Sequence, residues 1–560
     1  MRKNVIICAA VGLIMLAATT VFAGQVSPKK THVHYQPPKL TVVVVIDQCA
    51  WHYFNRLKPF FTGGLKELLD RGVVYTQAYH AHGIPETTPG HHAIATGTLP
   101  KDHGAITNQW LDNDCHKIAY DNDASLYSSI LDNGTNVCQG KSAHNTMVDG
   151  LSDQFMLRSL GTTQNNVFAL SLKSYPAIAM AGRMGKALWF NEKTGKFTSS
   201  RRYFKKLPDW VIDFNKKESI AKIPLFDWDL AYPSNAPAYD FPYIDDKAHA
   251  AYKFSLIGKG AVRVDLSKKE PYEFFMRCPS ASESLLRFAQ TCLKEYFDAK
   301  GQERMLLWVS LSNLDLLGHM YGPDSREVVD MLYHIDHQLK GFIEALDQIA
   351  GSGKYLLALT ADHGVAPIPE IQQKKGFHQA LRISQDKLIA GMNMHIQKRF
   401  QVSGVVASFE PSFFWLNQSI MKKLSHKLQR KIKKALVYYL RGYRGIKNAW
   451  TRKELKRLTF KESDLEQFYK NQLYHGRCGD IVCQPQPYCL VTHYLTGTSH
   501  ATPYDYDTHV PLMLYQPGLL AHRYVHTKVW VPQLPVTLAK LVRVSRPSVS
   551  TYDVLPGLGF

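Results

Sequence analysis

Charged or metal-competent side chains follow four apolar runs of the chain. Asp47, Lys173 and Asp315 each end one run, and the pair Asp362-His363 ends the fourth. The runs are LTVVVVIDQ (40–48), NVFALSLKS (166–174), MLLWVSLSNLD (305–315) and KYLLALTADHG (354–364). Continuous apolar runs of this kind are typical of strands buried on both faces of a parallel sheet. Since ligands bind beyond the carboxyl ends of such strands, we expect these side chains to meet at one edge of the sheet.

The spacing around Asp315 predicts one metal site. His319 lies four residues after Asp315, so both side chains share one face if a helical turn follows the strand. A second histidine, His500, comes late in the chain, where Gly497 and Thr498 indicate a loop. One aspartate and two histidines suit Zn²⁺ with an open coordination position.

Asp47, Asp362 and His363 form a second candidate metal site. Consecutive residues of a strand face opposite ways. Asp362 and His363 can therefore share a metal only where their strand has ended, and Gly364 fits such a bend. Two cations about 3.5 to 4 Å apart are a recurrent device for phosphoryl transfer, in which one activates the nucleophile and the other stabilises the leaving oxygen.

The stretch PETTPGHHAIATG, residues 85–97, places a hydroxyl beside an expected helix start. The apolar helical pattern begins at His91, so Thr87 would lie near a helix N-terminus, where backbone amides and the helix dipole favour an anion. A free threonine is a poor nucleophile, but coordination to a metal lowers the pKa of its hydroxyl. The alternative is structural, with Thr87 or Thr88 acting only as a helix N-cap.

The whole pattern predicts an α/β fold with a largely parallel central sheet flanked by helices. Helical stretches fall between or beside the apolar runs, as crossover connections require, at residues 60–70, 91–97, 281–299 and 325–350. The segment between Gly364 and Thr498 is too long for a single connection. We expect one catalytic domain over residues 39–560, with insertions at about 184–277 and 371–497, and a cap subdomain in the second insertion.

The first 23 residues predict an export signal. Arg2 and Lys3 precede an apolar stretch over residues 5–18, and Val21-Phe22-Ala23 has the small-residue pattern of a signal-peptidase site. The stretch is shorter than the roughly 20 residues that a membrane span needs. We therefore expect cleavage, a linker over residues 24–38, and a mature protein that is periplasmic or secreted.

Export bears on the cysteines. Without Cys8 the chain keeps eight, an even number in a compartment that permits disulfides. Two pairs of sequence neighbours are candidates for bridges, Cys115 with Cys138 and Cys278 with Cys292. The alternative is that most of the eight are buried thiols.

The chain is basic, with a formal net charge of +20 that falls to +18 when Arg2 and Lys3 are removed. Such a balance favours anionic partners through long-range attraction. Much of the excess lies in residues 421–458, where apolar residues recur every four positions and predict an amphipathic helix: Leu424, Leu428, Ile432 and Leu436. A solvated basic face is the simpler interpretation. The alternative is a weak contact of this helix with an anionic membrane surface or another polyanion.

Five motifs together resemble the alkaline phosphatase superfamily. They occur in the family's order as VVIDQ, TTPGHHAIATGTLPKDHGAITNQW, LDLLGH, TADHG and GTSHATPYDYDTHVPL. The resemblance is greatest to the branch of zinc-dependent, threonine-nucleophile phosphatases and nucleotide pyrophosphatase/phosphodiesterases. Within that branch, ALWFNEKTGKFTSS and LPDWVIDFN are similar to the bacterial periplasmic monoesterases.

The resemblance implies a role for each candidate residue. It makes Thr87 the nucleophile that forms a phosphothreonine intermediate, with two Zn²⁺ per chain. One zinc would be bound by Asp47, Thr87, Asp362 and His363, and the other by Asp315, His319 and His500. Asn108 matches an asparagine that donates a hydrogen bond to a phosphoryl oxygen, and Lys173 a lysine that contacts the phosphate. A structural role is expected for the other histidines around the site: His80, His82, His91, His92 and His103.

One departure from the family affects the expected substrate. The resemblance leads us to expect an arginine two residues after Lys173, where this chain has Tyr175. Loss of a bidentate cation should weaken the preference for a monoester dianion, unless Arg183 or another basic residue substitutes. We expect a phosphate monoester hydrolase of small phosphorylated substrates with no specific nucleic-acid partner.

Two alternatives stay open. The first is a phosphodiesterase or nucleotide pyrophosphatase with the same nucleophile and metals. The second is a non-enzymatic, polyanion-binding envelope protein that has kept the fold. A sulfatase is less favoured, because it would need a C/S-x-P-x-R pattern where this chain has Thr87-Thr88-Pro89-Gly90-His91.

Overall fold

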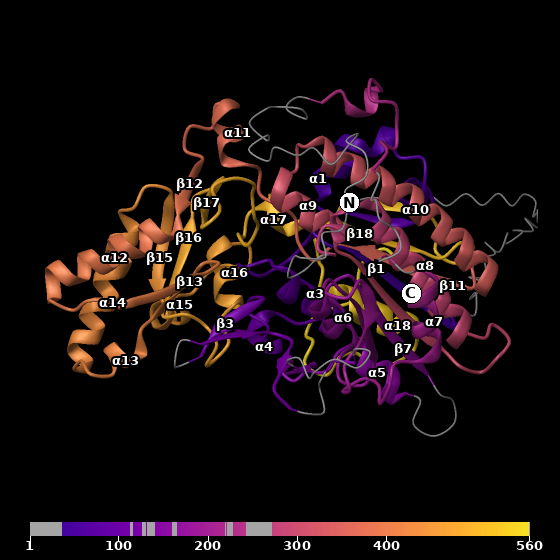
Figure 1. Cartoon of the computed structure of the whole chain (residues 1–560), viewed down its shortest axis with the longest axis horizontal. Helices are drawn as coiled ribbons and strands as arrows, with labels where there is room; N and C mark the ends of the chain where they lie inside the picture. The colour runs from indigo at the N-terminus through magenta and orange to yellow at the C-terminus, as the bar shows by residue number, and fades with distance from the viewer. Residues whose placement is uncertain are drawn as a thin grey trace, which may run out of the picture. The chain divides into compact units, whose positions relative to one another are not determined.

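A ten-stranded sheet is the largest sheet of the described structure (Figure 1). The computed structural model describes residues 36–112, 116–125, 130–131, 140–158, 165–218, 220, 228–241 and 272–558. Residues from Pro37 onward belong to one unit. The expected export signal, most of the linker, and Cys115 and Cys138 lie outside the described residues.

The four apolar runs are neighbouring strands of this sheet. They are β1 (Leu40–Ile46), β7 (Asn166–Ser171), β10 (Met305–Leu311) and β11 (Tyr355–Thr360). β10 and β11 pair in parallel with the two sides of β1, and β7 pairs in parallel with β10. β1, β10 and β11 are buried along their whole length. The prediction of a parallel sheet buried on both faces is therefore confirmed for these strands.

Antiparallel and edge strands complete the sheet. The strand order is β19-β2-β18-β11-β1-β10-β7-β8-β9, and β20 also pairs with β2. β18 runs antiparallel to both β11 and β2. The added strands are β2 (Val73–Tyr79), β8 (Lys186–Asn191), β9 (Lys196–Thr198), β18 (His509–Tyr515), β19 (Arg523–Val525) and β20 (Val529–Trp530). β8 and β9 lie within the range expected as the first insertion, where residues 242–271 are outside the described part.

Helices cover both faces of the sheet, as Figure 1 shows for α8 and α10 on one side and α3, α5 and α6 on the other. The first group is α1 (Trp51–Leu57), α2 (Gly64–Arg71), α8 (Pro279–Tyr296), α9 (Asn313–Tyr321) and α10 (Arg326–Ala350). The second group is α3 (Thr87–Thr96), α5 (Leu151–Leu157), α6 (Ser174–Ala181) and α18 (Gln533–Leu541). Other helices of this part are α4 (Pro100–His103), α7 (Asp209–Lys217), α11 (Pro369–Lys374) and α17 (Asp505–Thr508).

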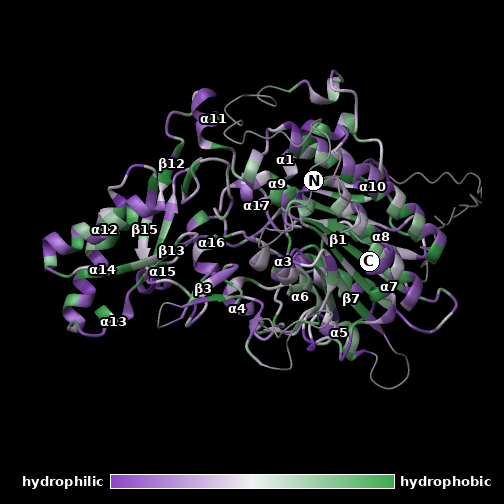
Figure 2. Ribbon diagram, viewed as in Figure 1, coloured by the Kyte–Doolittle hydropathy of each residue, from purple (hydrophilic) through white to green (hydrophobic). Residues whose placement is uncertain are grey.

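The segment between β11 and β18 builds a second sheet with its own apolar core. Its four antiparallel strands follow the order β13-β14-β16-β15 and span Val406–Glu410, Phe413–Leu416, Ile481–Pro485 and Ile446–Thr451. The helices around it are α12 (Gln385–Phe400), α13 (Gln418–Met421), α14 (His426–Arg441), α15 (Arg452–Arg457) and α16 (Leu465–Asn471). The core includes Leu388, Phe414, Leu436 and Ile481. Figure 2 shows polar and apolar residues mixed along α12 and α14, as expected for helices that pack one face against this core.

The basic stretch 421–458 is not one helix, and that prediction was wrong. α14 ends at Arg441, β15 follows, and α15 is a separate short helix. Ile432 and Leu436 are buried in the second core, as their spacing required. The chain turns at Gly445, whose φ of 89° favours glycine, and the strand β15 then pairs with β16.

Three further sheets of the described structure have two strands each. They pair β3 (Gln109–Leu111) with β4 (Lys117–Ala119), β5 (Asn122–Asp123) with β6 (Gly140–Lys141), and β12 (Leu381–Ser384) with β17 (Cys489–Thr492).

The described cysteines are free thiols, so the expected bridge between Cys278 and Cys292 is wrong. Cys278 is the N-cap of α8 and Cys292 lies near its other end. A helix rises about 1.5 Å per residue, which separates the two residues far beyond the Cα distance of a disulfide. In the described residues, no helix has the length and apolar character needed to cross a membrane.

Candidate active site

The carboxyl ends of β11, β1, β10 and β7 bring the candidate residues together. Asp47 directly follows β1, and Asp362 and His363 follow the end of β11. Lys173 is the N-cap of α6, two residues after β7. Asp315 lies in the first turn of α9 rather than on the strand. Because the strands are neighbours and mostly parallel, side chains separated by hundreds of residues reach one site.

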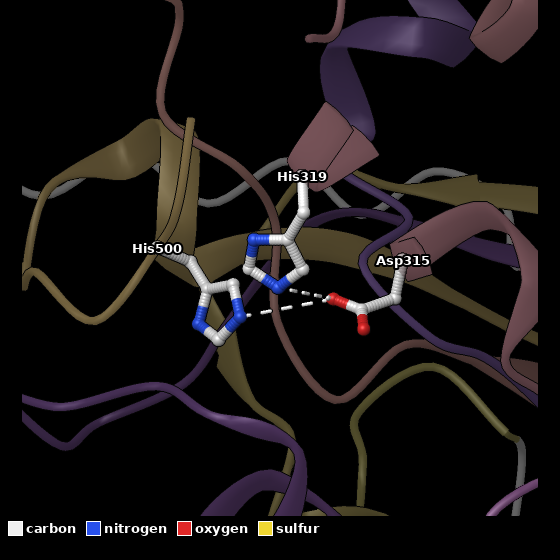
Figure 3. Close-up of side chains that lie close together, drawn as sticks. All are labelled: Asp315, His319 and His500. Carbon is white, nitrogen blue, oxygen red and sulfur yellow. Dashed lines mark ion pairs between the residues drawn. The ribbon is translucent and has the colours of Figure 1, made fainter. Parts of the chain in front are cut away.

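Asp315, His319 and His500 form the Asp315 cluster (Figure 3). His319 Nε2 lies 3.2 Å from Asp315 Oδ1, and His500 Nε2 lies 3.7 Å from the same oxygen. The spacing of Asp315 and His319 on one helix face is as expected, since both belong to α9. His500 comes from the loop that follows Gly497, whose φ is 72°.

Asp47, Asp362 and His363 form the Asp47 cluster. His363 Nε2 lies 3.4 Å from Asp47 Oδ1 and 3.4 Å from Asp362 Oδ2. All three side chains are fully buried. Asp362 and His363 point to a common centre because β11 ends at Thr360, before either residue.

A backbone carbonyl fixes the ring orientation of each of the three histidines in the clusters. The Nδ1 atoms of His319, His363 and His500 lie 2.8 to 3.0 Å from the carbonyl oxygens of Thr498, Gly364 and Pro85, respectively. A hydrogen on Nδ1 leaves Nε2 as the free acceptor, and each Nε2 faces a carboxylate. A carbonyl that orients the non-ligating nitrogen is usual for metal-binding histidines.

Two buried oxygens of the Asp47 cluster accept no hydrogen bond. Asp47 Oδ1 and Asp362 Oδ2 are sealed from solvent and have no hydrogen-bond partner in the described structure. Orphaned carboxylate oxygens are costly unless a cation satisfies them. Together with Nε2 of His363, they make a donor set that fits a transition-metal cation at the Asp47 cluster, and Asp315 with the Nε2 atoms of His319 and His500 offers a similar set at the Asp315 cluster.

The electrostatics of the clusters follow from burial and crowding. Burial and the nearby Asp315 and Asp362 raise the pKa of Asp47, and burial raises the pKa of Asp362 to about 7. Burial lowers the pKa of His500 to about 3, so its ring is neutral. Burial also opposes ionisation of Asp315, but Lys173 and His319 outweigh it and hold the pKa of Asp315 well below its usual range.

Thr87 begins α3 and faces the Asp47 cluster. Its Oγ1 lies 3.5 Å from His363 Nε2, and its side chain is buried. The helix begins at Thr87, four residues earlier than the expected start at His91, and its N-cap is Glu86. Thr87 and Thr88 are therefore the first two helical residues, and the interpretation of either as an N-cap was wrong. The early start places the Thr87 hydroxyl at the N-terminal end of the helix dipole.

Lys173 bridges the two clusters. Its Nζ donates to Asp47 Oδ2 at 2.8 Å and to Asp315 Oδ2 at 2.5 Å. The side chain is almost completely buried. An ammonium has three protons, so one remains for a further acceptor.

Asn108 approaches Thr87 from the segment after α4. Its Oδ1 accepts a hydrogen bond of 2.8 Å from the backbone amide of Thr88, and the backbone amide of Asn108 donates to Glu86 Oε2 at 2.8 Å. With the oxygen held in this way, the Nδ2 protons point elsewhere and can donate to a ligand.

Arg183 does not take the place where Tyr175 stands. Arg183 is exposed and donates its Nη2 to the carbonyl of Thr146. Lys173 Nζ lies 5.9 Å from the centre of the Tyr175 ring. The basic residue beside this region is Lys141, which donates to Asp121 at 2.5 Å and to Ser174 Oγ at 2.7 Å.

Sequence reasoning missed residues that orient the ligands. Gln48 donates from Nε2 to Asp315 Oδ1 at 2.7 Å and from its backbone amide to Asp362 Oδ1 at 3.1 Å. His91 Nδ1 is hydrogen-bonded to the carbonyl oxygen of Thr87 at 2.8 Å and lies 3.1 Å from Asp362 Oδ2, while its Nε2 lies 2.9 Å from Ser310 Oγ. The sequence did offer one indication for His91: it lies one helical turn after Thr87 and so on the same helix face. A Cβ at Gly90 would clash with the carbonyl of Asp362, which explains the glycine there.

The remaining histidines expected to be structural belong to neither cluster. All are fully buried. His92 Nδ1 lies 2.8 Å from the carbonyl of Thr88, and His80 Nε2 lies 2.9 Å from that of Ala361. His82 and His103 lie beside them, with ring centres 5.2 Å from His80 and 5.1 Å from His92.

Comparison with known proteins places the chain in a family. The family model for type I phosphodiesterase / nucleotide pyrophosphatase matches residues 41–510. Alkaline phosphatase PhoV of Synechococcus elongatus is 27% identical over 98% of this chain and 99% of its own length. Alkaline phosphatase PafA of Elizabethkingia meningoseptica is 26% identical, covering 95% of this chain and 96% of its own. A crystal structure of wild-type PafA superposes with a TM-score of 0.81 at 23% identity, covering 93% of this chain and 98% of that one, which shows that the two share a fold.

The family match extends over most of the chain, from β1 into β18, and so includes every residue of both clusters. The chain belongs to the type I phosphodiesterase / nucleotide pyrophosphatase family and is a phosphoric ester hydrolase.

Proposed function

We propose that the protein is a phosphate monoester hydrolase that uses two zinc ions and works through a phosphothreonine at Thr87. The observation that carries this proposal is Lys173, whose ammonium lies between Asp47 and Asp315 and keeps one proton for an incoming oxygen. A monoester dianion carries one more negative charge than a diester and gains more from such a cation. The two relatives named alkaline phosphatase support the same reaction class.

The proposed reaction has two displacements at phosphorus. The Thr87 oxygen attacks the phosphorus, the bond to the ester oxygen breaks, and the alcohol leaves with one proton. Water then attacks the phosphothreonine, the bond between phosphorus and the Thr87 oxygen breaks, and inorganic phosphate is released. When bound, zinc at the two clusters would lower the pKa of the threonine hydroxyl and stabilise charge on the leaving oxygen.

The protein's own groups hold the transferred phosphoryl group. Asn108 Nδ2 and Lys173 Nζ would donate to its non-bridging oxygens from two sides. Preorganised donors of this kind, aimed at developing charge, commonly contribute several kcal/mol each. The Asp47 cluster would hold one zinc with Thr87, and the Asp315 cluster the other.

Tyr175, which stands where an arginine was expected, should reduce the preference of the enzyme for monoesters over diesters. The Tyr175 phenol makes no hydrogen bond with a described residue, and its partial burial raises its pKa, so the hydroxyl is a neutral donor. Lys141 could add positive charge, but Asp121 already neutralises much of it. A phosphodiesterase is therefore the second candidate function, favoured by the absence of an arginine at this position. The intact ligand set argues against the non-enzymatic alternative.

The test compares kcat/KM for an aryl phosphate monoester and its methyl diester at pH 8. The variants are wild type, Lys173→Ala and, as a control for loss of a lysine, the exposed Lys340→Ala. We expect the wild type to prefer the monoester, and Lys173→Ala to lose about 10²- to 10³-fold with the monoester and much less with the diester. A wild type that prefers the diester, with Lys173→Ala leaving monoester turnover unchanged, would make the protein a phosphodiesterase.

Export and surface contact are further proposals. We infer that residues 1–23 direct the chain out of the cytoplasm, which fractionation of cells that express the full chain can test. We also propose a weak, salt-sensitive contact of α14 and α15 with anionic membranes. Absence of co-sedimentation with phosphatidylglycerol vesicles at low salt would refute that contact.

A further inference from the structure

A small pocket opens directly from the candidate active site. Its walls include Asn108, Glu86 and His500 from the site, and Phe409 and Glu410 from the second sheet. Its volume is about 190 Å³. An alcohol leaving from a phosphoryl group held by Asn108 beside the Asp315 cluster would enter this pocket.

The charge of the pocket is opposite to that of the protein. The net charge of the chain is +20. The pocket is lined by the Glu410 carboxylate and by Glu86, whose pKa burial raises to about 8, and no Lys or Arg is among its lining residues. By contrast, seven Lys or Arg side chains and only two carboxylates line a groove of about 1080 Å³ between α14 and α15. The basic surface groove therefore attracts anions, whereas this pocket does not.

Glu410 is held with its carboxylate at the pocket wall. Its Oε2 accepts a hydrogen bond of 3.0 Å from Gln109 Nε2, and its Oε1 lies 2.8 Å from Lys117 Nζ. Glu410 is only 10% exposed, whereas Lys117 is 58% exposed and does not line the pocket. Water screens the charge of Lys117 far better than that of Glu410. The electrostatic potential inside the pocket is therefore negative.

The rest of the wall combines apolar and neutral polar groups. Phe409, Leu490 and Tyr494 supply apolar surface, and Gln109, Gln385 and Ser412 supply hydrogen-bonding groups. Pockets for drug-sized ligands usually measure about 300 to 1,000 Å³. This one is smaller and suits an alcohol of a few heavy atoms.

We propose that this pocket is the leaving-group subsite and that Glu410 makes it select phosphate esters of small neutral or cationic alcohols over esters whose alcohol carries an anion. The inference rests on the proposed phosphoester hydrolysis at Thr87. An ammonium or hydroxyl on the alcohol donates to the Glu410 carboxylate, whereas a carboxylate or second phosphate there meets a like charge in a poorly solvated place.

The test uses three esters of similar size: 2-aminoethyl phosphate, 2-hydroxyethyl phosphate and phosphoglycolate, whose alcohol portions are cationic, neutral and anionic. For the wild type we expect kcat/KM to fall in that order. In Glu410→Gln, the ratio of kcat/KM for the amino ester to that for phosphoglycolate should fall about tenfold, as expected when one nearby unit charge is removed from a partly screened site. High salt should reduce the wild-type ratio in the same direction.

Glu454→Gln is the matched control. Glu454 is also an ion-paired carboxylate of the second sheet region, 3.0 Å from Arg441, but it faces the groove of α14 and α15. Glutamine preserves its capping box with Thr451. The ratio should not change in this variant. An unchanged ratio in a folded Glu410→Gln that still hydrolyses the esters overturns the subsite, whereas no hydrolysis of any ester by the metal-loaded wild type overturns the proposed function instead.

Discussion

The carboxylate of Asp336 caps a helix that is remote in sequence, and its loss should destabilise the fold strongly. Asp336 lies in the middle of α10 and is fully buried. Its two oxygens accept hydrogen bonds from the backbone amides of Thr62, Gly63 and Leu65 at 2.7 Å each and of Lys66 at 3.2 Å. These amides include orphan donors at the start of α2, which has no side-chain cap of its own.

The expected magnitude follows from these four bonds. In Asp336→Asn one side-chain oxygen still accepts two of the four hydrogen bonds. The other oxygen becomes an NH₂ group, which cannot accept, and it faces either the amides of Thr62 and Gly63 or those of Leu65 and Lys66. Two charge-assisted bonds are lost, each worth about 1.5 to 3 kcal/mol. We therefore expect a loss of about 4 kcal/mol in the free energy of unfolding, large for a single substitution.

The assay is urea unfolding followed by tryptophan fluorescence, with reversibility checked by refolding. Glu344→Gln on the same helix is the control, because Glu344 is exposed and has no ion pair or hydrogen bond in the described structure. It should change the free energy of unfolding by less than about 0.5 kcal/mol. A loss below about 1 kcal/mol in Asp336→Asn would refute the argument that this carboxylate caps α2.

Three further predictions concern the site and its surroundings. The purified mature protein should bind two transition-metal ions per chain by elemental analysis, and Asp315→Ala or His500→Ala should remove about one of them; an active enzyme without metal would contradict the scheme. Thr87→Ala should abolish turnover with metal content and far-UV circular dichroism unchanged, whereas a dead Thr88→Ala beside an active Thr87→Ala would show that the nucleophile is misassigned. Burial lowers the pKa of His334, but its pairing with Asp330 outweighs burial and raises it above the usual value. The stabilisation from protonated His334 is therefore complete below the unfolded pKa of about 6.5 and lost as the pH rises through the folded pKa, so His334→Gln should cost more stability at pH 6 than at pH 9; an equal cost at both would exclude the pairing.

Much of the catalytic sheet could be predicted because its signals are local. An apolar run long enough to be buried on both faces identifies β1, β7, β10 and β11 without reference to their neighbours. The residues at their ends could be proposed as one site because parallel strands share an edge. The pair Asp315 and His319 could be read in the same way, since four residues separate them on one helix.

Other features could not be predicted from the sequence, because they depend on contacts with segments that are distant in the chain. Periodicity predicted one helix over residues 421–458, but α14 ends at Arg441. The chain then turns at Gly445, and the following residues form the strand β15 because they pair with β16. The start of α3 moved back to Thr87, where Asn108, twenty-one residues later in sequence, accepts a hydrogen bond from the next backbone amide.

What the sequence by itself determined was the type of chemistry, and what the tertiary structure decided was its geometry. Asp, His and Lys at strand ends, with Thr87 at a helix start, indicate metal-assisted phosphoryl transfer before the strand order is known. Only the packed structure brings Lys173 between Asp47 and Asp315 and sets Glu410 in the wall of the pocket beside Asn108. The physical reason is range: hydrophobic periodicity acts over a few residues, whereas an ion pair or pocket wall joins side chains that meet only after the sheets have assembled.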